Sequence, residues 1–272
     1  MALPLRDDHG RRAVPWITLG LIAINVLVFL FVQPVGFQSG ASDEPTADRR
    51  APSQEALWQV RDRDVFTYRY GAVACEVVTG ETLAERPEGC HGEVGDHLPD
   101  TKSIALSLLT AMFLHGSIGH LAGNMLFLWV FGARVEQRLG RGNFLGLYVF
   151  GGVLATLGYV ALNPTSTAPL VGASGAIAVV MGTYLVLFPR GRVLTVIATA
   201  AFQVVYVPAS VVLALFFVTQ FFTSDEQVAW EAHAAGMVVG ALAGLVLARI
   251  PAIRHRGELE REDALLRSGR EF

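Results

Sequence analysis

The stretch 170-LVGASGAIAVVMGTYLVLF-188 decides how this chain must fold. It is an apolar block without a charged residue, it is ended by Pro189, and it carries Ser174 close to its start. A helix needs about 17 to 25 such residues to cross a hydrocarbon core of roughly 30 Å, because each residue rises about 1.5 Å. The stretch therefore predicts a membrane-spanning helix with a hydroxyl near one end.

Five other apolar blocks meet the same length test, some only just, in this chain of 272 residues, of which 52% are hydrophobic and 17% charged. The six blocks cover residues 16–32, 106–133, 144–162, 170–188, 207–222 and 228–248. We expect an all-α membrane protein, a bundle of six transmembrane helices with a long extracytoplasmic loop, about 33–103, between the first two.

Two boundaries leave alternatives. Block 16–32 follows basic residues and precedes small ones, as a signal peptide does, but its length favours a retained anchor. The uncharged run from 193 to 222 is longer than one crossing requires. Because proline interrupts the helical hydrogen bonds, Pro208 is expected to divide this run into an interfacial stretch and a true span.

Basic residues in the short connections predict the orientation. They occur in every second connection: Arg6, Arg11 and Arg12; Arg134, Arg138 and Arg141; Arg190 and Arg192; Arg249, Arg254 and Arg256. We expect a cytoplasmic N-terminal segment at 1–14, a membrane domain at 15–250 and a cytoplasmic tail at 251–272. The scarcity of lysine suggests a bacterial genome, so we expect a multi-pass protein of a bacterial plasma membrane with both termini cytoplasmic.

The loop 33–103 contains more acidic than basic residues, with proline and glycine, which favours an irregular, partly ordered segment. Within it, the aromatic-rich patch 65–73 is the part that best suits the membrane interface. The chain's two cysteines, Cys75 and Cys90, also lie there. They either form a disulfide, which an oxidising compartment permits, or remain two free thiols.

Polar residues that suit one reaction lie near the same end of three separate blocks. They are Ser174, His233 and the pair His120 and Asn124. Polar groups inside a bilayer are costly, so their shared depth suggests a reaction centre. Each residue alone has an ordinary structural explanation, because a serine in a membrane helix often bonds to its own backbone and His or Asn can link helices.

Small residues recur every four positions on two of these blocks. They are Ser174, Ala178 and Gly182 on one block and Gly236, Gly240 and Gly244 on the other. Such stripes let helix backbones approach closely in lipid, and His233 lies one turn before Gly236. If the two stripes dock, Ser174 and His233 meet.

A hydroxyl needs an adjacent base to act as a nucleophile, which makes Ser174 the candidate nucleophile and His233 the candidate base. Gly172 permits a substrate carbonyl to approach, and the Ser174 amide can donate to an oxyanion. His120 and Asn124 share one helix face and are candidate oxyanion donors. His115 is expected nearer the interface, where it orders water or loop structure.

Three motifs together resemble the rhomboid family of intramembrane serine proteases. They are 115-HGSIGHLAGN-124, 172-GASG-175 and 233-HAAG-236 followed by Gly240, and the resemblance covers residues 15–250. It implies a six-helix bundle whose water-filled active-site cavity opens to the extracytoplasmic side, and a Ser174/His233 dyad without a carboxylate. It also implies that His120, Asn124 and the Ser174 amide stabilise the oxyanion, and that 207–222 and 223–227 form a substrate gate and cap.

The resemblance further implies a structural pair of Glu136 and Arg138 at the other end of the second span. Two departures concern the surroundings of the dyad. Some members carry Tyr where this chain has Ala178, and no clear Trp-Arg motif precedes the second span. Both departures leave the reacting groups in place.

The sequence therefore predicts a serine endopeptidase that cleaves transmembrane or juxtamembrane segments of membrane proteins through an acyl-enzyme, with no metal or cofactor. Its expected partners are such substrates and the lipid bilayer, and no nucleic acid. A catalytically silent relative that binds membrane proteins is the alternative, although silent relatives typically lack Ser or His. A transporter fits less well, because the polar groups cluster at one depth.

Overall fold

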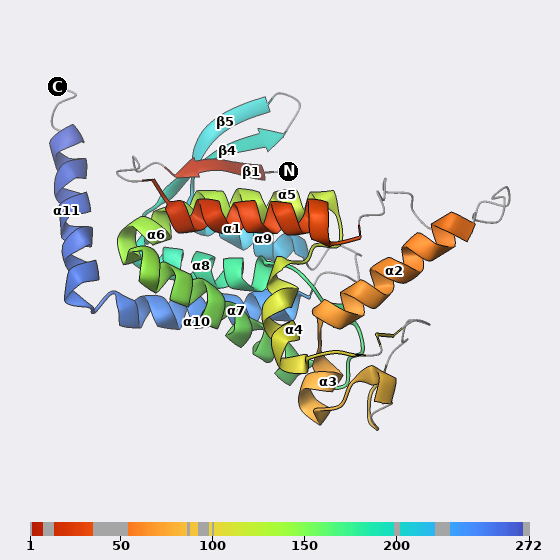
Figure 1. Cartoon of the computed structure of the whole chain (residues 1–272). Coiled ribbons are helices and arrows are strands. Elements are labelled where there is room, and N and C mark those ends of the chain that lie inside the picture. The colour runs from red at the N-terminus through yellow and green to blue at the C-terminus, as the bar shows by residue number, and fades with distance from the viewer. Residues whose placement is uncertain are drawn as a thin grey trace.

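The computed structural model describes residues 2–7, 14–34, 54–85, 88–91, 98–99, 101–198, 202–220 and 229–268. Its described part is mostly helical (Figure 1). Three helical stretches are long and apolar enough to cross a membrane: Ile118–Leu139, Arg141–Leu162 and Trp230–Leu247. Shorter apolar helical stretches cover Trp16–Val32, Ile104–Phe113, Ser174–Leu187 and Ala209–Thr219.

The helices of the bundle follow the predicted blocks in order. They are α1 (Trp16–Leu27) with the π-helical turn η1 (Val28–Val32), α5 (Ile118–Phe127), the π-helical turn η4 (Leu128–Gly132), α6 (Ala133–Leu139), α7 (Arg141–Leu162), α8 (Ser174–Leu187), α9 (Ala209–Gln220) and α10 (Trp230–Leu247). A last helix, α11 (Pro251–Ser268), leaves the bundle near α6 (Figure 1).

The block predicted at 106–133 is divided, contrary to our expectation. α4 (Ile104–Thr110) ends in the 3₁₀ turn η3 (Ala111–Phe113), and α5 begins only at Ile118. The reason is an N-cap, since the extended Ser117 accepts a hydrogen bond from the amide of His120 through Oγ (3.1 Å). His120 consequently lies in the first turn of α5, although it is near the middle of the predicted block 106–133.

Two small antiparallel sheets depart from the all-α prediction. One has the order β1-β4-β5 and joins Ala2–Asp7, Arg192–Ala198 and Phe202–Pro208. The other pairs β2 (Ala72–Val73) with β3 (Pro169–Leu170). The β4–β5 hairpin replaces the interfacial stretch expected before Pro208, because its runs of valine, threonine and isoleucine favour strands.

The segment between α1 and α4 is more regular than we expected. Its elements are α2 (Gln54–Tyr70), which projects from the bundle, then β2, α3 (Ala74–Thr79) and the 3₁₀ turn η2 (Leu83–Glu85) (Figure 1). The patch 65–73, which we expected at a membrane interface, forms the end of α2 and strand β2, and Ala72 and Val73 are buried against the rest of the protein.

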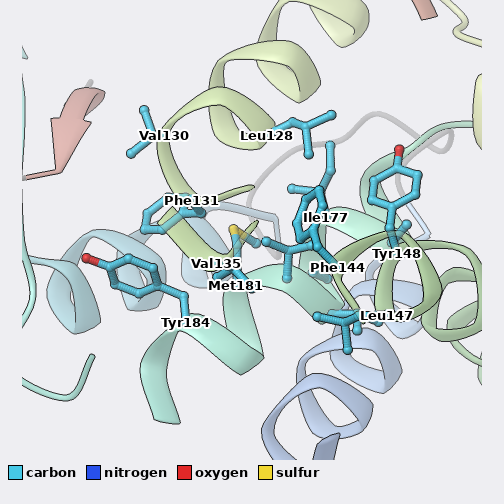
Figure 2. Packing of buried hydrophobic residues seen from close by; sticks show 14 of the residues in the cluster. Leu128, Val130, Phe131, Val135, Phe144, Leu147, Tyr148, Ile177, Met181 and Tyr184 are labelled. Atoms are coloured by element: carbon cyan, nitrogen blue, oxygen red, sulfur yellow. The ribbon is translucent and has the colours of Figure 1, made fainter. Parts of the chain in front are cut away.

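α8 lies in the middle of the bundle, with α1 and α5 on one side and α7 and α10 on the other (Figure 1). Every residue from Ala176 to Tyr184 is buried, as expected for a helix that is apolar on all sides. Figure 2 shows side chains from η4, α6 and α7 packed on Ile177, Met181 and Tyr184 of this helix. This packing fixes the helix that begins with Ser174.

The end of the bundle opposite Ser174 is held by charged groups. Glu136 accepts hydrogen bonds from the amides of Ile17 (3.0 Å) and Thr18 (2.8 Å) and from the Thr18 hydroxyl (2.8 Å), which satisfies free donors at the start of α1. Arg138 forms an ion pair with Glu260 of α11 at 3.1 Å. Glu136 and Arg138 thus each bind a different helix.

Candidate active site

The backbone before α8 changes direction at Gly172, where φ is 129°. A Cβ added there would lie 3.0 Å from both Cε1 and Nε2 of His120 and 3.5 Å from Oγ of Ser174. The imidazole of His120 and the hydroxyl of Ser174 therefore both lie close to the Cα atom of Gly172. Gly172 leaves the room that any larger residue would fill, and its amide donates to the carbonyl of Ala111 (2.8 Å).

α8 begins at Ser174 itself, shortly after strand β3 and the positive φ of Gly172. The serine therefore lies at the start of the helix, although the apolar block 170–188 begins before it. Because Ser174 is the first residue of the helix, its backbone amide has no hydrogen-bond acceptor within the helix. Such an amide is free to bind an oxyanion at the point where the hydroxyl is presented.

The glycine stripe of α10 packs against α8 as the sequence predicts. A Cβ at Gly236 would lie 2.6 Å from the carbonyl oxygen of Gly175, and one at Gly240 would overlap the backbone of Val179. The hydroxyl of Thr183 also donates to the carbonyl of Gly240 (2.8 Å). Backbones this close can be reached only where α10 carries no side chain.

This docking brings the His233 turn of α10 beside the first turn of α8, since Gly236 lies one turn after His233 and contacts the residue after Ser174. His233 is buried, and the ring of Phe216 on α9 lies 6.3 Å from the imidazole between ring centroids. Phe216 also packs on Phe127 of α5 at 4.6 Å. The ring of Phe216 thus packs near the His233 imidazole, whereas Ala178 of α8 has no ring that could do so.

The other polar residues line the start of α5. Asn124 is 8% exposed, and among the described residues its Nδ2 has no hydrogen-bond partner. The ring of His115 is fully buried and lies edge-on to His120, with 5.3 Å between centroids. Asn124 therefore keeps a buried donor available to a ligand, and His115 supports the ring of His120.

Gln33 is a contributor that sequence reasoning missed. Its Nε2 donates to the carbonyl of His115 (2.7 Å), and its Oε1 accepts from the His115 amide (3.1 Å). This paired bond fastens the end of the first span to the turn before α5. A lone amide side chain after an apolar block was the only available signal, and it did not indicate a partner 82 positions away.

Cys75 and Cys90 form a disulfide in the structure, with 5.7 Å between their Cα atoms. The proposed cap at 223–227 lies outside the described residues, as do Arg11 and Arg12. The site is thus built by α5, α8 and α10, with α9 at its side and a disulfide-closed segment near the loop that enters α8.

Comparison with known proteins agrees with this architecture. The Rhomboid domain model matches residues 103–250. Zebrafish (Danio rerio) Presenilin-associated rhomboid-like protein A, mitochondrial, is 35% identical over 96 residues, which are 35% of this chain and 25% of that protein. Rhomboid protein 1, mitochondrial, of Saccharomyces cerevisiae is 38% identical over 93 residues, 33% of this chain and 27% of that protein. Rhomboid protease GluP of Bacillus subtilis is 39% identical over 94 residues, 34% of this chain and 18% of that protein.

The fold and motifs define a helical membrane protein. The chain belongs to the rhomboid family, since the family match covers more than half of it. Its alignments span about a quarter or less of the length of these relatives. The expected bacterial plasma membrane location is wrong on these comparisons, because relatives from fish, cattle and yeast are mitochondrial proteins by name. Arginine preference was too weak a signal for the compartment.

Proposed function

We propose that this chain is an intramembrane serine endopeptidase that cleaves transmembrane or juxtamembrane segments of other membrane proteins. The observation that carries the proposal is the backbone contact between Gly236 and Gly175, which sets the His233 turn against the helix that begins with Ser174. The same first turn of α8 also faces His120 across Gly172. A nucleophile, a base and oxyanion donors are thereby supplied from separate helices.

In the proposed reaction, Oγ of Ser174 attacks the scissile carbonyl while the imidazole of His233 takes its proton. The oxyanion receives hydrogen bonds from the Ser174 amide, His120 and Nδ2 of Asn124. His233 then protonates the leaving amine. A water deprotonated by His233 hydrolyses the acyl-enzyme, and Ser174 is regenerated.

The proposed membrane domain spans 15–250, with 1–14 and 251–272 as flanking segments. Its six crossings are the helical stretches that begin at Trp16, Ile118, Arg141, Ser174, Ala209 and Trp230. The shorter helical stretches among them suit a site near one surface of the membrane. A crossing helix that begins below that surface leaves space for water next to its first residue. Substrate enters beside α9, where the Phe127–Phe216 contact must open. Substrate helices with glycine near the cleaved bond unwind most easily.

Cleavage of a tagged single-span substrate in lipid vesicles tests the proposal. The parent chain is expected to release two fragments, and Ser174→Ala and His233→Ala are each expected to abolish the release. Binding without cleavage by the parent would favour a silent membrane-protein binder. Cleavage that survives Ser174→Ala would refute the assignment of the nucleophile.

A further inference from the structure

The segment 71–91, here called the clamp, is attached to the loop 163–173 that leads into Ser174. The backbone amide of Cys75 donates to the carbonyl of Ser166 (3.0 Å), and that of His91 donates to the carbonyl of Thr165 (2.8 Å). One attachment is thus made by a cysteine and the other by the neighbour of its partner, Cys90. The disulfide closes the clamp into a ring, and the two ends of this ring are hydrogen-bonded to two adjacent residues of the loop.

A second contact reaches closer to Ser174. Strand β2 of the clamp pairs with β3, with Ala72 opposite Leu170 and Val73 opposite Pro169. A Cβ at Gly71 would lie 3.2 Å from side-chain carbons of both Pro169 and Val171, so the clamp presses on the loop there. The paired strand ends just before Gly172, which faces His120.

The clamp is also fixed to the start of α4. Glu76, next to Cys75, accepts a hydrogen bond from the amide of Leu83 (2.9 Å) and forms a buried ion pair with Lys102, the only lysine of the chain. Burial lowers the pKa of the Lys102 amine, and the Glu76 carboxylate opposes that shift. Directly before the clamp, the carbonyl of Tyr70 accepts a hydrogen bond from the hydroxyl of Thr110 on α4 (2.7 Å).

The loop before Ser174 therefore lies between two supports. The clamp holds it from one side, and the carbonyl of Ala111, which accepts from the Gly172 amide, holds it from the other. If the clamp opens, the loop loses the support on that side and keeps the contact on the η3 side. A displacement of about 1 Å at a reacting group can lower a rate by roughly 10²-fold.

We infer that the Cys75–Cys90 disulfide is a positioning device for Ser174, so that the thiol–disulfide state of the clamp sets the rate of acylation. This inference rests on the proposed function. A dithiol reduces the bond to two thiols by supplying two electrons and two protons, and is itself oxidised to a cyclic disulfide. Reoxidation by an excess of a small-molecule disulfide passes two electrons and two protons to that disulfide, which becomes two thiols, and restores the clamp.

The test uses the full chain in lipid vesicles and a fluorophosphonate, which bonds its phosphorus to Oγ of Ser174 and releases fluoride. Labelling is followed over time for the oxidised chain, the chain reduced with a dithiol, and the reduced chain after reoxidation. A maleimide mass tag on the two cysteines reports the redox state in each sample. Global damage would lower the labelled fraction, whereas mispositioning lowers the rate constant at saturating probe.

We expect reduction to lower the saturated labelling rate at least about tenfold, with the final labelled fraction unchanged and the rate restored by reoxidation. The double variant Cys75→Ser/Cys90→Ser should be labelled at the rate of the reduced parent chain. Adding the dithiol should not change that rate. The matched control Glu81→Gln, on the exposed surface of the clamp, should behave as the parent. Equal rates in the oxidised and reduced chains, or a loss confined to the labelled fraction, would overturn the inference. No Ser174-dependent labelling of the oxidised chain would instead refute the proposed function.

Discussion

Replacing Gly236 by alanine should separate the two helices that carry Ser174 and His233. The added Cβ would lie 2.6 Å from the carbonyl oxygen of Gly175 and 2.9 Å from Cβ of Ala178, whereas ordinary contacts begin at 3.4 Å. Neither neighbour is a flexible side chain, so the α8 or α10 backbone must shift by several tenths of an ångström. Overpacking of this kind costs about 1–3 kcal/mol.

Part of that cost is offset, because alanine favours a helix over glycine by about 1 kcal/mol. We therefore expect a modest loss of stability, about 0–2 kcal/mol from these two values, and a large loss of reactivity. The shift lies between nucleophile and base, where about 1 Å can lower a rate by roughly 10²-fold. Fluorophosphonate labelling should slow at least about tenfold, with a small change in the unfolding temperature.

The matched control is Gly20→Ala on α1, where an added Cβ meets no atom within 4 Å. This variant should label at the parent rate and be at least as stable. Labelling of Gly236→Ala at the parent rate would refute the reasoning, because it would show that the spacing of α8 and α10 does not govern the site.

Three further substitutions separate chemistry from stability. Asn124→Ala should lower kcat on a single-span substrate about 10²- to 10³-fold. The unfolding temperature should change little, since Nδ2 of Asn124 has no hydrogen-bond partner among the described residues. A fall in kcat of less than about threefold would show that Asn124 is not part of the oxyanion site. Glu136→Leu leaves the hydrogen-bond donors at the start of α1 unpaired, which costs about 1–3 kcal/mol for each donor. The unfolding temperature should therefore fall clearly, while the protein that remains folded is labelled by the fluorophosphonate at the parent rate. An unchanged unfolding temperature would contradict this role of Glu136. Glu260→Gln removes the partly buried carboxylate shared by Arg134 and Arg138. Breaking a fully buried pair costs about 3–5 kcal/mol, so a smaller fall in the unfolding temperature is expected here. Equal unfolding temperatures for parent and variant would show that α11 does not fasten the bundle.

The contact between α8 and α10 could be predicted from the sequence because helical periodicity and small residues determine it. Gly236, Gly240 and Gly244 lie on one face, and a face without side chains lets a neighbouring helix approach closely. The polar residues near one end of three blocks were visible for the same reason. Helical spacing and hydropathy are local signals, and these features depend on little else.

The features that escaped prediction depend on contacts between distant residues. Strand β1 pairs with β4 across most of the chain, and short apolar runs such as 193–198 fit a strand or a membrane helix equally well by hydropathy. The division of the second block arises from Ser117 acting as an N-cap. Charged partners were equally hidden, since nothing local to Glu136 indicates the amides of α1.

Mass spectrometry of the fluorophosphonate adduct tests the central claim most directly. The parent chain in vesicles should carry one adduct, on the peptide that contains Ser174, and His233→Ala should form it at least about 10²-fold more slowly. An adduct on any other residue, or labelling of Ser174 at the parent rate without the His233 imidazole, would contradict a serine nucleophile activated from the neighbouring helix.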